Sequence, residues 1–145
     1  MDDHNARRRA AEAFWASHRA TWEASGGTEM AEVLGMKVIQ LNTVGRVTGT
    51  PRWVLLTTLP ADGGGWLVAA SNLGADHDPD WWQNLRAAGG QGSVTVDGDT
   101  VPVVAEELSG DERAAAYERF VETYPDYASY REQTSREIPV VHLKP

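Results

Sequence analysis

Short runs of apolar residues, several of them alternating with polar ones, fill the chain after residue 36 and are typical of β-strands. Gly, Pro, Asp and Asn separate these runs, and such residues favour tight turns. Strands that are joined by tight turns pair antiparallel. The pattern predicts strands over residues 37–43, 52–59, 65–70, 93–96, 100–107 and 139–143.

Other segments space their apolar residues as a helix does. In residues 5–24 this spacing makes one aromatic face, formed by Ala11, Phe14, Trp15, His18 and Trp22. A short second helix is expected over residues 29–34. A third begins at Asp78 and Pro79, the expected N-cap and first helical position, and ends at a Gly pair. Two more are predicted over residues 110–122 and 126–134, separated at Pro125.

The role of the first helix stays open between three hypotheses. It packs over the core, covers a ligand as a lid, or lies at a membrane surface. Three consecutive arginines, Arg7, Arg8 and Arg9, stand near its start, where they oppose the helix dipole and therefore do not serve as caps. His18 is interpreted as a packed or partly exposed imidazole rather than a ligand.

Composition and charge limit the classes of protein to which this chain can belong. A length of 145 residues suits a single domain, and the formal net charge of −8 argues against nucleic acid as a partner. The absence of cysteine excludes disulfides and thiolate-bound metals. No apolar run approaches the roughly 20 residues of a membrane-spanning helix. We expect a cytoplasmic location, with peripheral contact at the inner face of the cell membrane as the open alternative.

One cluster of metal-binding residue types is present but is not expected to hold an ion. Asp76, His77 and Asp78 are consecutive in one loop, and adjacent residues rarely converge on one ion. No second histidine stands at ligand spacing. The sequence therefore predicts no metal site.

The turn between the first two predicted strands carries candidate binding chemistry. Gly45 and Gly49 allow a tight turn that exposes backbone N–H groups. Arg46 and Arg52 flank it, and a guanidinium can hold a phosphate through two parallel donors. From residue 37 to 60 there are three cations and no acid, in an acidic chain. The turn is either a charged hairpin or a phosphate cradle.

Two further groups of polar residues are candidates for a ligand site. Ser71 follows the third predicted strand and is either an ordinary turn hydroxyl or a ligand donor. Tyr124, Tyr127 and Tyr130 recur at spacing three, which predicts either a buried aromatic stripe or the polar wall of a pocket. Arg136 is expected at the mouth of the sheet.

The order of these motifs resembles a known family. A GRxTGxPR turn, a strand ending in AAS, a DPxWWxNL helix, a hairpin and a YPxYxxY segment before IPVV follow one another from residue 37 to 145. This order resembles the deazaflavin-dependent nitroreductases, actinobacterial enzymes that use reduced coenzyme F420. The resemblance implies an α+β fold, a split β-barrel (an FMN-binding-like roll) of about six mostly antiparallel strands with flanking helices. Residues 1–36 would pack on or cap the barrel, and residues 37–145 would form the deazaflavin-binding domain.

The resemblance also implies roles for individual residues. The cofactor's phosphate would be held at the turn by Arg46, Val47, Thr48, Gly49 and Arg52. The deazaflavin ring would lie against Ala70, Ser71 and Asn72, and the cofactor's linker beside Trp81 and Asn84. The catalytic candidates are Ser71 and the phenols of Tyr124, Tyr127 and Tyr130, with Tyr130 or Tyr127 as the hydrogen-bond donor to the substrate.

Some positions depart from the family's pattern. Val47 stands where a lysine is usual, Leu55 where a proline is common and Thr57 where an aromatic residue is common. Asn72 and Leu73 replace a frequent Lys/Gly-Gly pair. The cofactor site is expected to survive because both arginines remain, whereas the range of substrates stays open.

The resulting hypothesis is an oxidoreductase that transfers a hydride from reduced coenzyme F420 to a quinone, nitro or conjugated enone acceptor. Three alternatives remain: a non-catalytic F420 carrier or sensor, an FMN-using split-barrel oxidoreductase, and a membrane-surface adaptor. The oligomeric state is left open.

Overall fold

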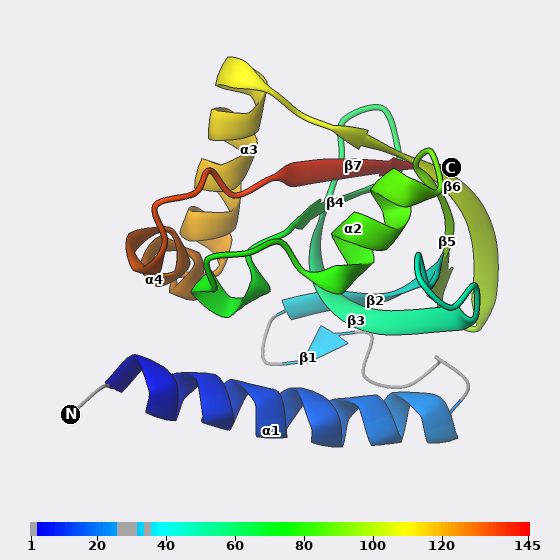
Figure 1. Cartoon of the computed structure of the whole chain (residues 1–145), viewed down its shortest axis with the longest axis horizontal. Helices are drawn as coiled ribbons and strands as arrows, with labels where there is room; N and C mark the ends of the chain where they lie inside the picture. Colours follow the sequence, from blue (N-terminus) through cyan, green and yellow to red (C-terminus); the bar gives the residue numbers. More distant parts are fainter. Residues whose placement is uncertain (1–2, 26–31, 34–35) are drawn as a thin grey trace.

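The computed structural model describes residues 3–25, 32–33 and 36–145. Its elements are arranged around one barrel (Figure 1). In chain order they are α1 (Asp3–Ala24), β1 (Glu32–Val33), β2 (Met36–Val44), β3 (Pro51–Pro60), β4 (Trp66–Ala69), the 3₁₀ helix η1 (Asn72–Gly74), α2 (Asp80–Ala87), β5 (Gln91–Val96), β6 (Asp99–Glu107), α3 (Gly110–Thr123), α4 (Asp126–Gln133) and β7 (Val140–Lys144).

The strands form one antiparallel sheet that closes on itself. Their order is β1-β2-β3-β4-β7-β6-β5, and an additional pairing of β2 with β5 joins the two sides of the sheet. Closure leaves the six strands β2 to β7 without long free edges. The fold class and the six barrel strands predicted from the sequence are confirmed.

The helix predicted over residues 29–34 is wrong for the part of it that the structure describes. Glu32 and Val33 form β1, which pairs antiparallel with the first residues of β2. A six-residue helix has few internal hydrogen bonds, whereas the edge of β2 offers backbone partners directly. The other residues of that prediction lie outside the described part of the chain.

The core fills the barrel and extends beneath α2 on one hand and beneath α3 and α4 on the other. Inside the barrel, Ile39, Leu41, Val94 and Leu143 are buried, and Leu85 of α2 packs against them. A second cluster joins β3 and β4 to α3 and α4, which lie together on one side of the barrel (Figure 1). Helix α2 thus packs on the barrel cluster, whereas α3 and α4 pack on the second cluster.

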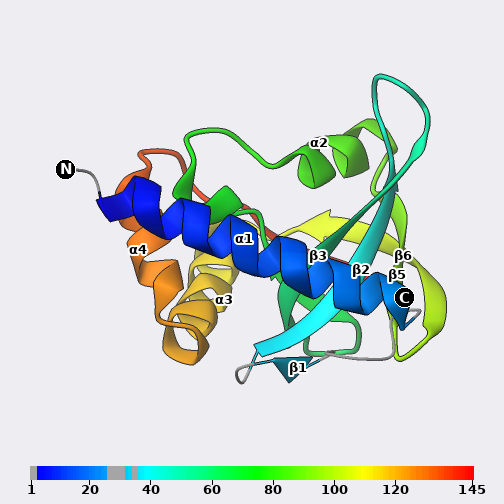
Figure 2. The ribbon, with the colours of Figure 1, turned by 90° about the horizontal axis from the view of Figure 1, so that it is seen from below.

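The helix α1 lies across β2 and β3 (Figures 1 and 2). Its second half is anchored there: Trp22 is only 1% exposed, and its indole N–H donates to Gln40 Oε1 at 2.7 Å. The guanidinium of Arg19 stacks on the ring of Trp53. His18 is buried and stacked on Trp15, so the packed imidazole predicted for it is confirmed. The first half of α1 reaches toward α4 (Figure 2).

The division into residues 1–36 and 37–145 stays a prediction.

Among the described residues, none of the helices is both long enough and apolar enough to cross a bilayer.

Candidate functional site

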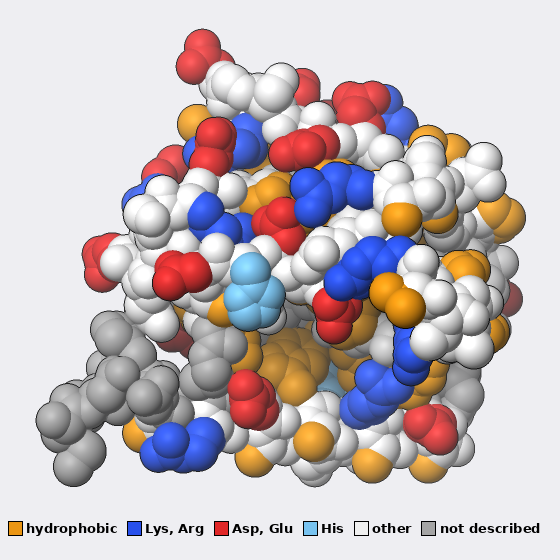
Figure 3. All heavy atoms as spheres, viewed as in Figure 1, with side chains coloured by type: hydrophobic (Ala, Val, Ile, Leu, Met, Phe, Trp, Pro, Cys, Tyr) orange, Lys and Arg blue, Asp and Glu red, His pale blue; other side chains and the backbone are white. Residues whose placement is uncertain are grey.

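A cavity of about 1190 Å³ opens between the first half of α1, the β2–β3 turn, η1, α2 and α4. The space-filling view shows a hollow with an apolar interior and with Lys and Arg side chains on one side (Figure 3). All but two of the predicted site residues line this cavity: Arg46, Val47, Thr48, Arg52, Ser71, Asn72, Trp81, Asn84, Tyr124, Tyr127 and Tyr130. The cavity thus brings together residues that are more than eighty positions apart in the sequence.

Gly49 and Ala70 are the two predicted site residues that do not line the cavity. Ala70 is fully buried in the barrel core, and its neighbour Ala69 faces the cavity instead. Successive side chains of a strand point to opposite faces, so only one of the two alanines can face the cavity. Gly49 serves the turn itself: its φ of +72° favours glycine.

The β2–β3 turn is tightly closed. The N–H of Gly45 donates to Thr50 O, and the N–H of Gly49 donates to Gly45 O, both at 2.8 Å. A Cβ on Gly45 would lie 2.9 Å from Thr48 Oγ1 and 3.3 Å from Arg52 Nε. Because Gly45 has no side chain, the Thr48 hydroxyl and the Arg52 guanidinium can close over the turn without being displaced.

Arg46 is held by α2. Asn84, buried on that helix, accepts a hydrogen bond from the Arg46 backbone N–H at 3.2 Å and another from its Nη1 at 2.8 Å. The Asn84 amide nitrogen donates to Thr43 Oγ1, at the end of β2. Asp80 accepts from Arg46 Nη2 at 3.2 Å. The resemblance placed Asn84 in the site, but the sequence carried no indication of the role of Asp80.

Arg52 has a different environment. Its Nη2 donates to Thr48 Oγ1 at 3.4 Å, and Thr48 in turn shares a hydrogen bond with Thr50. No acidic side chain within the described part of the chain forms an ion pair with Arg52. Two guanidiniums and the Thr48 hydroxyl in the lining of a large cavity suit a phosphate group. Val47, at the tip of the turn, is 89% exposed and supplies no charge.

The opposite end of the cavity is lined by phenols from α4 and from the segment before it. The rings of Tyr127 and Tyr130 lie 5.2 Å apart in an edge-to-face arrangement. Burial raises the pKa of the Tyr127 phenol far above its ordinary value, and the neighbouring Tyr130 raises it further, whereas a hydrogen bond with Thr57 lowers it. Tyr127 therefore stays protonated, and able to donate, at any physiological pH.

Tyr124 is the phenol that is least suited to act on a substrate. Its hydroxyl donates to Thr58 O at 3.2 Å and accepts from the Lys37 backbone N–H at 3.3 Å. These bonds tie the end of α3 to β2 and β3. A substrate contact by this hydroxyl would break a bond to the sheet backbone.

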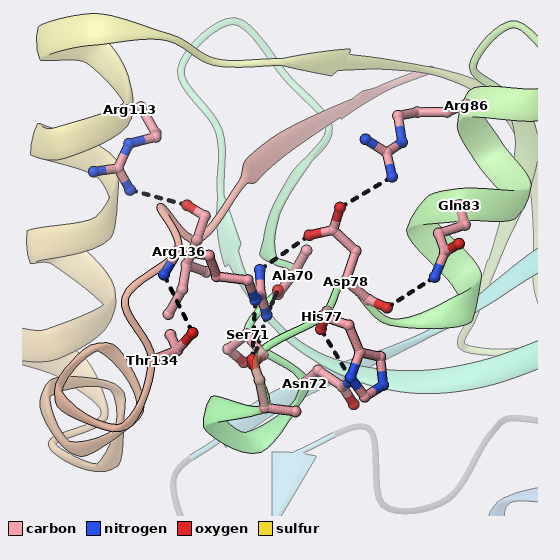
Figure 4. Close-up of polar contacts among 12 residues, drawn as sticks. Ala70, Ser71, Asn72, His77, Asp78, Gln83, Arg86, Arg113, Thr134 and Arg136 are labelled. Atoms are coloured by element: carbon pink, nitrogen blue, oxygen red, sulfur yellow. Dashed lines mark hydrogen bonds and ion pairs between the residues drawn. The ribbon is translucent and has the colours of Figure 1, made fainter.

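The wall that carries Ser71 is positioned by Arg136 (Figure 4). Its guanidinium donates to the carbonyls of Ala70 (3.0 Å), Ser71 (3.1 Å) and Ala75 (2.9 Å), and it pairs with Asp78 at 3.0 Å. The predicted place of Arg136, at the mouth of the sheet, did not reveal this role, because its partners lie about sixty residues away.

The prediction that Asp78 is the N-cap of α2 is wrong. Pro79 occupies the N-cap position, and no side chain caps the helix. The carboxylate of Asp78 instead bridges Arg136 and Arg86, each at 3.0 Å (Figure 4). Two ion pairs compete successfully with one capping bond.

Within the described residues, no group of three His, Cys, Asp or Glu side chains is arranged to hold a metal ion. The donors of the site on Arg, Thr and Tyr suit an organic anion, although the carboxylate of Asp80 also lines the cavity.

The closed barrel and its cavity place the chain among the split-barrel proteins, and the solved structures it resembles include F420-dependent reductases. A solved F420-H2-dependent reductase, FDR-A, is 32% identical and has a TM-score of 0.65, with 74% of this chain and 93% of that chain covered. A second solved structure, described as a domain-swapped dimer, is 30% identical and has a TM-score of 0.68, with 92% and 99% covered.

The family model of the F420H2-dependent quinone reductases matches residues 15–145, so the chain belongs to this family. A curated relative from Mycobacterium tuberculosis, named a putative F420H(2)-dependent quinone reductase, is 38% identical over 79 residues. The matched region covers 54% of this chain and 66% of that relative. The family resemblance, the class of enzyme and the cofactor predicted from the sequence are confirmed at the level of the family.

Proposed function

We propose that this protein transfers a hydride from reduced coenzyme F420 to a quinone that lies in the same cavity. The observation that carries the proposal is the arrangement of the cavity lining: Arg46 and Arg52 come from the β2–β3 turn and its edge, and Tyr127 and Tyr130 from α4, on the opposite side of the barrel (Figure 1). A cofactor with an anionic tail and a planar ring would be oriented by such a site.

The residues of the chain would bind and orient the two reactants. Arg46 and Arg52 hold the phosphate, and the Ser71 segment, fixed by Arg136, forms the wall against the ring. When bound, the reduced deazaflavin supplies the hydride. A phenol of Tyr127 or Tyr130 donates a hydrogen bond to the acceptor oxygen, where negative charge develops.

The apolar face of α1 favours a quinone among the possible acceptors. Phe14 and Trp15 of α1 line the cavity, and so do Trp53 and Leu55 of the barrel strand β3. These surfaces suit a flat, uncharged ring and exclude water from the site of transfer. Nitro and enone acceptors, and a membrane contact through α1, stay predictions; the side chains of Arg7 and Arg8 lie outside the described part of the chain.

The experiment measures both binding and turnover. The protein is titrated with oxidised coenzyme F420 and, separately, with FMN; then reduced F420 is mixed with menadione, and the return of the oxidised cofactor's fluorescence is followed. The proposal expects selective binding of F420 and protein-dependent turnover. Tight F420 binding without turnover of any quinone would favour the carrier or sensor, and a preference for FMN would favour the flavin enzyme.

A further inference from the structure

The guanidinium of Arg46 has two partners of opposite character. Asn84 is neutral, 5% exposed, and accepts from both the backbone and the side chain of Arg46. The Asp80 side chain is charged and 85% exposed, and its Oδ1 lies 3.2 Å from Arg46 Nη2. Both partners line the cavity. The amide fixes the position of the guanidinium, whereas the carboxylate offsets part of its charge.

A carboxylate at this position opposes the binding of an anion. Asp80 stands in the first turn of α2, where a negative charge stabilises the helix through its dipole. The same charge repels a phosphate that approaches Arg46. The pair is also easily broken, because both side chains contact water and exposed ion pairs add little stability.

We propose that Asp80 is an internal counter-ion that the phosphate of the cofactor displaces from Arg46, and that it thereby sets the affinity of the site. This inference rests on the proposed function. In the free protein, Asp80 occupies the guanidinium edge that the phosphate requires. A hydride donor that is consumed in every turnover must leave the site or be reduced again there, and a displaceable carboxylate favours its release.

The test is a fluorescence titration with oxidised coenzyme F420 of the parent protein and three variants. Asp80→Asn removes the charge but keeps the size, and Asp80→Glu keeps the charge. The matched control is Asp62→Asn, an exposed position in the loop between β3 and β4, at the opposite end of β3 from the turn. Each titration is made at low salt and at high salt, and the melting temperature of each variant is recorded.

Asp80→Asn is expected to bind about 3- to 10-fold more tightly at low salt, since one repulsive unit charge near the phosphate is removed. This gain should shrink at high salt because the interaction is screened. Asp80→Glu and Asp62→Asn should stay near the parent. Tighter binding together with an unchanged or lower melting temperature cannot arise from a merely structural role.

Two results would overturn the inference. If the parent binds F420 and Asp80→Asn binds equally well or more weakly, Asp80 does not compete with the cofactor, and the proposed function stands without it. If the folded parent and all variants fail to bind F420, the proposed function and the inference fall together.

Discussion

The side-chain oxygen of Asn84 accepts two hydrogen bonds from Arg46, one from the backbone N–H and one from the guanidinium. A single buried amide on α2 thus fixes both the course of the β2–β3 turn and the direction of its cation. This link joins two predicted halves of the site, the turn and the helix.

Asn84→Ala should weaken F420 binding by about tenfold, because Arg46 loses the acceptor that orients it. The unfolding free energy should fall by about 1–3 kcal/mol, since Thr43 and Arg46 lose a buried partner. Fluorescence titration and urea unfolding measure the two effects. Gln91→Ala, at the exposed start of β5, serves as the control, and a parent-like affinity of Asn84→Ala would contradict the assignment.

Arg52→Ala tests the placement of the phosphate. This guanidinium has no acidic partner among the described residues, so its removal leaves no buried carboxylate unpaired. The loss of a charge-assisted contact should cost on the order of 2 kcal/mol in binding, roughly 30-fold in affinity. Binding as tight as that of the parent would mean that the phosphate lies elsewhere.

Tyr127→Phe and Tyr124→Phe separate a catalytic phenol from a structural one. Loss of a donor that faces the developing oxyanion should lower kcat by about 100-fold. Tyr124→Phe should mainly lower the melting temperature, because its hydroxyl bonds to the backbone of Thr58 and Lys37. Steady-state kinetics with menadione measure the effect on kcat, and thermal unfolding measures the effect on stability. If Tyr124→Phe mainly lowered kcat and Tyr127→Phe mainly lowered the melting temperature, the two roles would be exchanged. Tyr130→Phe tests in the same way whether Tyr130 is the donor to the substrate.

Arg136→Ala should disorganise the segment that carries Ser71 and reduce both F420 affinity and stability. Several hydrogen bonds to buried carbonyls are lost, which predicts a destabilisation of about 2–4 kcal/mol. Arg86→Ala is a matched control, because Arg86 binds the same Asp78 carboxylate but none of these carbonyls. If Arg136→Ala and Arg86→Ala lowered F420 affinity and stability equally, only the ion pairs with Asp78 would matter, and the bonds to the carbonyls would not.

Stability at high pH should depend on Tyr117. Burial raises the pKa of its phenol from 10.0 to about 12, and its hydroxyl donates to Tyr127 O. The folded state therefore keeps a proton that the unfolded chain loses, so stability is complete below pH 10 and falls as the pH rises toward 12. The two-unit shift corresponds to about 2–3 kcal/mol.

Urea unfolding of the parent and of Tyr117→Phe across this pH range checks that prediction. The variant loses one hydrogen bond at every pH, but its stability should fall less steeply above pH 10. Parallel curves would contradict the assignment.

Local signals in the sequence were sufficient to predict most of the fold. Alternation and turn residues placed the barrel strands to within a few positions, as for the run 65–70, which forms Trp66–Ala69. The short β1 was missed because its partner edge is a tertiary feature. Similarly, the choice between Ala69 and Ala70 depends on strand register, which the resemblance did not resolve.

The links between site residues are long-range, and the sequence could not reveal them. Asn84 reaches a turn 38 residues away, and Arg136 reaches Ser71 across 65 residues. A polar Asn84 between the apolar Trp81 and Leu85 of one helix was a usable signal, since a buried amide requires partners. Asp80 gave no such signal, because an acid in a first helical turn is ordinary.

The strand β3 acts as a rigid spacer between the two chemistries of the cavity. It carries Arg52 near its start and Thr57, the partner of the Tyr127 phenol, further along, about 17 Å away at the rise of an extended strand. Deleting two adjacent residues between them would keep the in–out alternation, so the barrel could still close. It would nevertheless bring Arg52 about 7 Å closer to Thr57, and a ligand shaped for the natural spacing would then no longer fit both ends.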